Sequence, residues 1–282
     1  MRLVLVANAR SGSATDAGEI ASRLRAHGAD VTLLDIGEAE RAADGRPDRI
    51  AVAGGDGSIG LVARTAARAE LPLAVIPSGT ANDFARALEL PMELDAACAL
   101  AADRAAHTTE IELAHAAERP FVNAASCGLS VIAARRAAPL KPRLGPLAYA
   151  IGALRAGASG RPIEARVTAD GEPVHDGPAW QVVVGATGAF GGGSSLEAAD
   201  PRDGLLDVAI MAAGSRAALV RHAWGMRFGR ITEQSGVTHA RAHRIEVHVP
   251  AGTRWNVDGE VCTLEPATFA AERGAVAVVV PR

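Results

Sequence analysis

Lysine is almost missing from this 282-residue chain: Lys141 is the only one, although lysine and arginine together number 29. The chain also contains no Gly-Lys-Ser or Gly-Lys-Thr sequence, which excludes the common P-loop. Any bound phosphate must therefore be held by arginine, backbone N–H groups, hydroxyls or a metal ion. The net charge of −3 argues against a protein that binds nucleic acid in bulk.

Cysteines and long apolar runs are scarce as well. The three cysteines lie far apart among apolar residues, a pattern typical of buried thiols in a cytosolic protein. The apolar run near the N-terminus, Leu3 to Ala7, is too short for a signal peptide. No run approaches the roughly 18 apolar residues of a membrane span. We therefore expect a cytoplasmic protein.

Strands and helices alternate through the first hundred residues. Short β-rich runs predict strands at 2–8, 29–36, 48–55 and 73–77, and helical spacing predicts helices at 14–28, 38–44, 58–70, 80–88 and 95–106. This alternation is typical of βαβ units. It predicts an α/β domain over residues 1–107, with a parallel sheet covered by helices on both faces.

The rhythm changes beyond residue 107, where strand-like runs follow one another closely. They lie at 107–113, 120–126, 163–169, 179–187, 205–211, 243–249, 253–257 and 275–280, with helices expected only at 130–137, 146–158 and 215–228. Glycine, aspartate and proline turns separate many of them, which predicts a mainly antiparallel β domain over 108–273. The C-terminal segment 274–282 is a candidate to return to the first domain, and a cleft between the domains is the expected active site.

The sequence GGDGS joins the third predicted strand to a helix, at the sheet edge where such folds bind ligands. Gly54, Gly55 and Gly57 let the backbone approach a phosphate closely, and the helix that begins near Ser58 offers free N–H groups. Asp56 would meet either a metal cation or the proton of an attacking hydroxyl. The alternative is a plain strand-to-helix turn in which the aspartate is a helix cap.

The sequence PSGTANDF repeats this shape after the next strand. Gly79 allows an unusual backbone angle, and Thr80 can cap a helix or contact a phosphate. Asn82 and Asp83 add polar groups to the expected first helical turn, so ordinary capping by Thr80 and Asp83 is the alternative. A third polar turn on the same sheet edge, NARSGS, contributes Asn8, Ser11 and Gly12. Three such turns at one edge favour a phosphate site.

Taken in order, NARSGS, GGDGS, PSGTANDFA and, far downstream, NVDGE resemble the diacylglycerol kinase catalytic-domain family, which includes bacterial lipid kinases and the sphingosine and ceramide kinases. GGDG is shared with NAD kinases and phosphofructokinases, whereas GTANDFA points to lipid kinases. The resemblance implies a first domain of the NAD kinase/phosphofructokinase type and transfer of phosphate from ATP, with Mg²⁺, to a diacylglycerol-like lipid hydroxyl. The nucleotide-binding positions that it implies are Asn8, Ser11, Gly12, Gly54, Gly55, Gly57, Ser58, Gly79, Thr80, Asn82 and Asp83.

The sequence Asp-Gly-Glu occurs twice, at 170–172 and 258–260. The first copy is expected to be a hairpin turn. The second matches the family's acidic pair, so the resemblance makes Asp258 and Glu260 candidates for the base that deprotonates the lipid hydroxyl. Two neighbouring carboxylates can raise one another's pKa toward neutrality. Asp258, supported by Glu260, is the favoured base, and Asp56 is the third candidate.

The sequence EAADPRDGLLDV resembles a family segment in which an aspartate and nearby carbonyl oxygens hold a structural magnesium. The resemblance implies Asp203, Asp200 and Leu205 as its ligands, while Asp56 would serve magnesium in the cleft. Hard cations prefer such oxygen ligands. The alternative is an ordinary turn before the strand at 205–211.

Two other functions stay open on the sequence alone. One is a NAD kinase or another small-molecule kinase on the same scaffold, and the other is a catalytically silent regulator that binds nucleotide or lipid. The expected partners are ATP and a lipid, without nucleic acid, and a homodimer is left open. Basic amphipathic segments at 134–157 and 215–230 suggest transient contact with the inner face of the membrane, with ordinary packed helices as the alternative.

Overall fold

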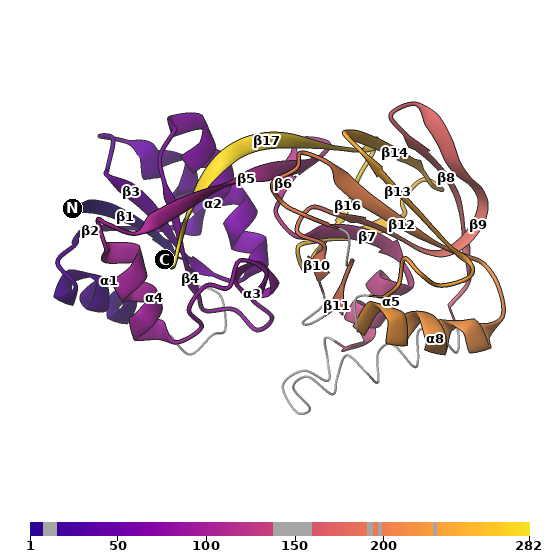
Figure 1. Cartoon of the computed structure of the whole chain (residues 1–282), viewed down its shortest axis with the longest axis horizontal. Coiled ribbons are helices and arrows are strands. Elements are labelled where there is room, and N and C mark those ends of the chain that lie inside the picture. The colour runs from indigo at the N-terminus through magenta and orange to yellow at the C-terminus, as the bar shows by residue number, and fades with distance from the viewer. Residues whose placement is uncertain (8–15, 138–159, 191–193, 197–198, 228–229) are drawn as a thin grey trace.

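The computed structural model describes residues 1–7, 16–137, 160–190, 194–196, 199–227 and 230–282. The chain forms two lobes that lie side by side, and two long strands run between them (Figure 1). Both termini belong to the first lobe. Among the described residues, no helix is long and apolar enough to cross a membrane.

The first lobe is built on a parallel sheet with the strand order β2–β1–β3–β4. Helices α1 and α4 pack on one face through residues such as Leu24 and Cys98, while α2 and the 3₁₀ helix η1 pack on the other through residues such as Val62 and Ala42. The elements are β1 (Arg2–Ala7), α1 (Ala17–Ala26), β2 (Asp30–Asp35), η1 (Ile36–Ala43), β3 (Arg49–Gly54), α2 (Asp56–Ala69), β4 (Leu73–Pro77), α3 (Asp83–Ala87) and α4 (Leu94–Ala102). The predicted α/β architecture is confirmed.

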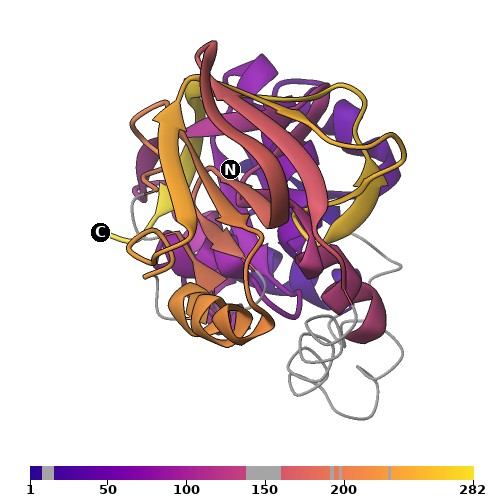
Figure 2. The same cartoon turned by 90° about the vertical axis from the view of Figure 1, so that its right-hand side faces the viewer.

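The second lobe is a mainly antiparallel sheet that curls around a core, also as predicted (Figure 2). In that core, the rings of Phe121 and Trp255 pack against Phe269, with centroids 6.3 Å and 5.1 Å away. The long strand β9 lies between β7 and β8 and also pairs with β12. The elements are β6 (Arg119–Phe121), β7 (Ala124–Gly128), α5 (Leu129–Ala137), β8 (Ile163–Ala169), β9 (Glu172–Gly185), β10 (Ala189–Phe190), β11 (Ser194–Ser195), β12 (Leu206–Ala212), α8 (Arg216–Arg227), β13 (Val237–Ala242), β14 (Arg244–His248), β15 (Arg254–Val257) and β16 (Glu260–Thr263).

Strands β5 (His107–Ala116) and β17 (Ala267–Val280) pair with each other along their lengths and belong to both lobes. At one end β17 pairs with β14, and at the other Val278 pairs in parallel with Leu73 of β4. The C-terminal strand therefore returns to the sheet of the first lobe. Because the strands at both expected boundaries are shared, dividing the chain at residue 107 and residue 273 stays a prediction.

Two local predictions are wrong. The helix expected over 80–88 begins only at Asp83, because Asn82 adopts a left-handed backbone conformation with φ of 51°. The strand expected over 120–126 is divided into β6 and β7, because the N–H groups of Val122 and Asn123 turn toward the carboxylate of Asp258, in the turn of a distant hairpin. The helix expected over 146–158 lies outside the described residues.

Candidate active site between the lobes

The two glycine turns predicted to hold phosphate lie side by side at the carboxyl ends of the neighbouring strands β3 and β4. Their backbones are so close that a Cβ on Gly79 would overlap Gly55, and a Cβ on Gly55 would lie 3.3 Å from the Cα of Gly79. The N–H of Ser78 also donates to the carbonyl of Gly54 at 3.1 Å. Only glycine fits at the point of contact, so these two turns form one wall of backbone.

Asp56 is the first residue of α2, yet its carboxylate caps a different helix. It accepts hydrogen bonds from the N–H groups of Asp83 at 3.2 Å and Phe84 at 2.9 Å, the first two residues of α3. The alternative interpretation, in which Asp56 caps its own strand-to-helix turn, is therefore wrong. Its carboxylate instead ties the GGDG turn to the GTAND turn.

The GTAND turn is also held by its own asparagine. The Asn82 side chain accepts from the N–H of Gly79 at 2.9 Å and donates to the carbonyl of Gly79 at 3.1 Å. Thr80 is exposed and precedes the helix, so the interpretation of Thr80 as the helix cap is wrong. Its hydroxyl stays available to a ligand. Asn8, Ser11 and Gly12 lie outside the described residues.

Asn123 joins the two lobes, and the sequence did not single it out. Its side chain is 2% exposed, donates from Nδ2 to Asp56 at 2.9 Å, and accepts from the hydroxyl of Thr187 at 2.7 Å. Its own N–H donates to Asp258 at 3.0 Å. One buried amide thus connects Asp56 with Asp258. The available signal was a single amide inside the otherwise apolar run FVNAA.

Asp258 occupies the turn of the hairpin β15–β16, where it and Gly259 both have positive φ, 46° and 90°. Its carboxylate accepts from the N–H groups of Val122, Asn123 and Ala124 at 2.8, 3.0 and 3.1 Å. Burial raises the pKa of Asp258 to about 7, and the negative charge of Asp56 adds to this, although the three backbone hydrogen bonds oppose it.

The other Asp-Gly-Glu copy forms the same kind of turn, as predicted. Asp170 and Gly171 have φ of 48° and 86° between β8 and β9, and the Asp170 carboxylate also accepts backbone N–H groups, those of His243 and Arg244. The turn is therefore not what distinguishes Asp258. Asp258 is distinguished by its neighbours, because Asn123 connects it with the glycine turns of the first lobe.

Glu260 completes the contact between the lobes. It is exposed, forms an ion pair with Arg119, and lies so close to Gly57 that a Cβ there would be 3.1 Å from a Glu260 carboxylate oxygen. Close by, a Cβ on Gly60 would be 2.9 Å from the carbonyl of Pro120, so α2 packs directly on β6. The structure thus brings Asp56, Asp258 and Glu260 to one place.

The aspartates expected to hold a structural metal lie on a loop before β12. Asp203 accepts from the N–H of Leu205 at 2.8 Å and pairs with Arg241, while Asp200 pairs with Arg202 at 2.9 Å. Within the described ranges, no group of three or more histidine, cysteine, aspartate or glutamate side chains is arranged to hold a metal ion. In the structure, Asp200 and Asp203 are thus paired with arginine side chains.

Glu112 is the carboxylate that the sequence missed near this loop. It is 1% exposed and accepts from the N–H of Gly204 at 2.9 Å, and its other buried oxygen has no hydrogen-bond partner among the residues that the structure describes. Burial raises the pKa of Glu112 to about 7, and the charges of Asp203, Asp200 and Asp207 raise it further. A buried carboxylate oxygen without a donor fits a hard cation.

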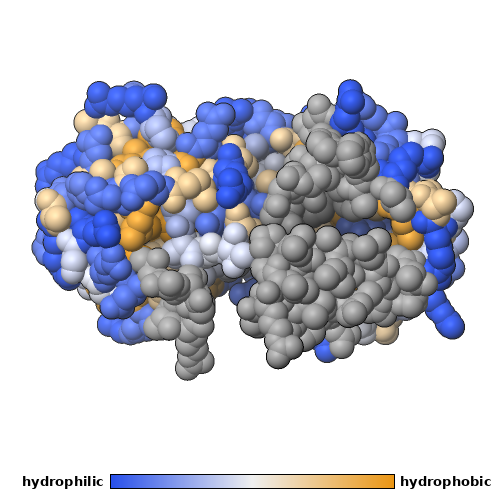
Figure 3. Space-filling model, turned by 90° about the horizontal axis from the view of Figure 1, so that it is seen from below, coloured by the Kyte–Doolittle hydropathy of each residue, from blue (hydrophilic) through white to orange (hydrophobic). Residues whose placement is uncertain are grey.

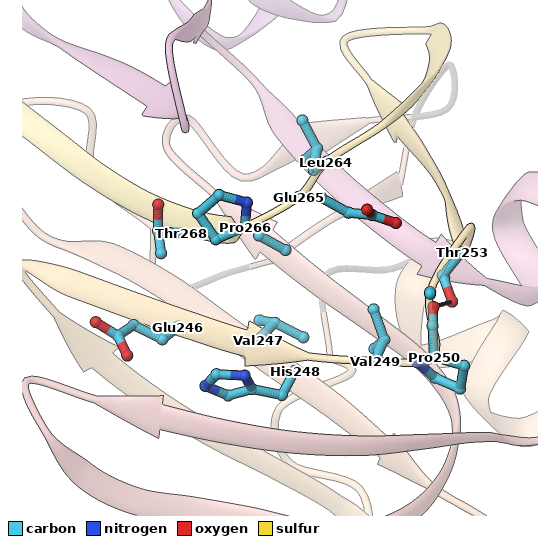
Figure 4. A pocket seen from close by; sticks show the side chains of 12 residues that line it. Glu246, Val247, His248, Val249, Pro250, Thr253, Leu264, Glu265, Pro266 and Thr268 are labelled. Carbon is cyan, nitrogen blue, oxygen red and sulfur yellow. Dashed lines mark hydrogen bonds between the residues drawn. The ribbon is translucent and has the colours of Figure 1, made fainter.

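A cavity of about 230 Å³ lies elsewhere, at the open end of the hairpin β15–β16 (Figure 4). Its lining includes apolar residues such as Val247 and Leu264 and the two carboxylates of Glu246 and Glu265. The candidate residues gather at the opposite end of this hairpin, around Asp258. This cavity is therefore not part of the candidate active site.

The surface seen from below offers no broad apolar face over the first lobe, where hydrophilic residues predominate (Figure 3). The large apolar side chains that stand exposed in the described part are Leu33, Met92 and Val261, which lie on separate segments. Most of the segment 134–157 lies outside the described residues.

Comparisons with known proteins identify relatives of both lobes. Residues 2–115 match the family described as diacylglycerol kinase catalytic domain, and residues 123–280 match the YegS C-terminal NAD kinase beta sandwich-like domain. The chain is 32% identical over 238 residues to a diacylglycerol kinase of Staphylococcus epidermidis, covering 82% of this chain and 74% of that protein. It is 30% identical over 274 residues to a diacylglycerol kinase of Mycobacterium tuberculosis, covering 93% and 88%.

Solved structures show the same fold. A diacylglycerol kinase from Bacillus anthracis superposes with a TM-score of 0.79 at 23% identity, covering 99% of this chain and 96% of the other. An NAD kinase from Archaeoglobus fulgidus gives a TM-score of 0.52 at 15% identity, covering 100% and 94%. At these identities the likeness concerns the fold alone.

Proposed function

Because this chain belongs to the diacylglycerol kinase catalytic-domain family and is thus a kinase, we propose that it transfers the γ-phosphate of ATP to a lipid hydroxyl, with a diacylglycerol-like acceptor. The observation that carries the proposal is the chain of hydrogen bonds from Asp56 through Asn123 to Asp258. It couples the glycine turns of the first lobe to the acidic hairpin of the second. A nucleotide on one side and an acceptor hydroxyl on the other would meet there.

The glycine wall is the proposed nucleotide site. Gly54, Gly55 and Gly79 present backbone without side chains, and the N-terminus of α2, which begins at Asp56, carries the positive end of a helix dipole. Ser58, Thr80, Asn82 and Asp83 would add polar contacts, as would Asn8, Ser11 and Gly12. Since phosphoryl transfer depends mostly on positioning and charge stabilisation, such a site does not require a P-loop lysine.

Glu260 is the carboxylate best placed to take the proton from the acceptor. The sequence favoured Asp258, but three backbone N–H groups already engage the Asp258 carboxylate. Glu260 is exposed and lies against Gly57, beside the proposed phosphate site. We therefore assign Glu260 as the base, and Asp258 as the residue that fixes the hairpin against the first lobe.

The magnesium that the family implies would be held by Asp203, Asp200, the Leu205 carbonyl and the open oxygen of Glu112, with Asp56 serving a cleft ion. Their oxygen chemistry fits Mg²⁺, which also retains several waters. Bound in the cleft, the ion would neutralise charge on the phosphates. The chain's own task at the loop is to hold β12 near β5, through the bond between Gly204 and Glu112.

The test is ATP turnover screened against diacylglycerol, phosphatidylglycerol, sphingosine, ceramide and NAD. Phosphorylation of a lipid hydroxyl is expected. Phosphorylation of NAD alone would sink the lipid proposal, and nucleotide binding without turnover of any acceptor would favour a silent regulator.

The duplicated Asp-Gly-Glu sequence provides matched controls for the base. Glu260→Gln should lower turnover about 100-fold or more while ATP binding is kept, because a general base contributes roughly 10²–10⁴-fold. Glu172→Gln, the same change in the other copy, should have no effect. Full turnover by Glu260→Gln would refute the assignment.

The proposal also includes a cytoplasmic location and transient contact with the membrane, since the acceptor is a lipid. Sedimentation with anionic vesicles that weakens with salt is the expected result. Binding that is absent at low salt would contradict membrane contact. A homodimer is tested separately, by the mass of the protein in solution.

A further inference from the structure

Asn256 carries a buried polar atom that nothing in the described fold satisfies. It lies on β15 between Trp255 and Val257, which are both buried in the core of the second lobe, so its side chain points to the opposite face of the sheet. Its Oδ1 is buried and has no hydrogen-bond partner. Leaving such a group unsatisfied is unfavourable, and a bound water or ligand group is one way in which a native structure satisfies it.

One hydroxyl lies on the strand next to this amide. Ser126 on β7 is directly opposite Asn256 in the antiparallel pair, so both side chains lie on the same face of the sheet. Ser126 is buried and accepts a hydrogen bond from Ser130 of α5 at 2.9 Å. On the far side of Ser126, Val183 of β9 begins an apolar cluster on this face. The polar side chains of Asn256 and Ser126 therefore lie beside an apolar cluster on the same face of the sheet.

This polar group is next to the candidate active site. Asn256 precedes Asp258 by two residues, with β15 ending between them at Val257, so their Cα atoms are at most about 7 Å apart. A lipid whose reacting hydroxyl lies near Asp258 and Glu260 would bring the next atoms of its headgroup within reach of Asn256. A carbonyl oxygen such as Oδ1 accepts hydrogen bonds and cannot donate one, so the matching ligand group is a hydroxyl or an N–H.

We infer that Asn256 is a specificity-determining residue that accepts a hydrogen bond from a second donor in the headgroup of the acceptor. The inference rests on the proposed lipid kinase function and replaces its diacylglycerol-like acceptor with a lipid that carries a second donor. A diacylglycerol has one hydroxyl, the reacting one, and its two esters offer no donor. The acceptor class defined by Asn256 therefore carries a further hydroxyl or amide N–H beside the hydroxyl that is phosphorylated.

The experiment compares kcat/KM for a monoacylglycerol, which has two hydroxyls, with that for a diacylglycerol of the same acyl chain, at equal mole fraction in detergent micelles. The wild type should prefer the monoacylglycerol about tenfold or more, as one buried hydrogen bond allows. Asn256→Leu, of similar size, should bring the ratio close to one. Asn256→Ser serves as the second variant if the leucine variant does not fold.

Thr253→Val is the matched control, because it removes a polar group at the other end of β15, where the hydroxyl of Thr253 donates to Pro250. It should keep the wild-type ratio. A purely structural role for Asn256 would lower both rates and leave the ratio unchanged, which would overturn the inference, as would a wild-type ratio near one. A wild type that phosphorylates no lipid would instead refute the proposed function, and this inference with it.

Discussion

Replacing Asn123 with leucine removes the side-chain link from the second lobe to Asp56 without opening a cavity. The two side chains are similar in size, but leucine can neither donate to Asp56 nor accept from Thr187. Asp56 would keep its hydrogen bonds from Asp83 and Phe84, so the cap of α3 would survive. The change therefore isolates the connection that passes between the lobes.

The expected loss of stability follows from these contacts. A hydrogen bond to a charged acceptor contributes about 1.5–3 kcal/mol, and a buried hydroxyl left without its acceptor costs about 1–3 kcal/mol. Asn123 is almost fully buried, so water does not replace either partner. We expect Asn123→Leu to lower the free energy of unfolding by about 3–5 kcal/mol. Displacement of Asp56 should also lower turnover about 100-fold.

Urea unfolding measures the first effect, and a double-mutant cycle with Thr187→Val identifies its origin. Thr187→Val alone should cost about 1–2 kcal/mol and clearly less when Asn123 is already leucine, because both changes break the same hydrogen bond and only the 3.3 Å bond from the N–H of Ala189 is then left to lose. A loss below 1 kcal/mol for Asn123→Leu, or full additivity of the two changes, would refute the role of Asn123 as the link.

Three further outcomes are expected. Gly79→Ala, whose Cβ would overlap Gly55, should weaken ATP binding at least about tenfold and cost roughly 1–3 kcal/mol, whereas Gly214→Ala, in open space, should change neither. Burial raises the pKa of Glu112 to about 7. The protonated carboxyl of Glu112 therefore stabilises the fold fully below about pH 4.5, and this stabilisation is lost as the pH rises through 7. Relative to Glu112→Gln, the wild type without added metal should thus lose about 3 kcal/mol of stability between pH 4.5 and 8 in chemical unfolding, and a flat difference would contradict this. Added Mg²⁺ should raise the melting temperature of the wild type but not that of Asp203→Asn. Equal shifts in the two proteins would contradict a metal site on this loop.

Features that depend on neighbours in the chain were predicted from the sequence. The alternation of strands and helices identified the α/β domain, because each βαβ unit repeats a local period. The hairpin at Asp170 followed from its Asp-Gly pair, since few residues tolerate positive φ. The late start of α3 was missed because Asn82 bonds with Gly79 only once the turn has folded.

Features that depend on distant segments appeared only in the tertiary structure. Asn123 and Asp258 are separated by 135 residues, and only the pairing of β7 with β15 brings them together. In the same way, nothing local in Glu112 indicates that it faces the loop of Asp203.

The sequence by itself therefore determined the kind of fold, the glycine turns and the acidic residues, because these follow from backbone conformation and residue chemistry over a few positions. Only the tertiary structure decided which groups share a site and which hydrogen bonds they already use. Those depend on strand pairing and burial across the two lobes. The difference decides function here, since Asp258 and Glu260 are two residues apart, yet one is enclosed by three backbone N–H groups while the other stays exposed beside Gly57.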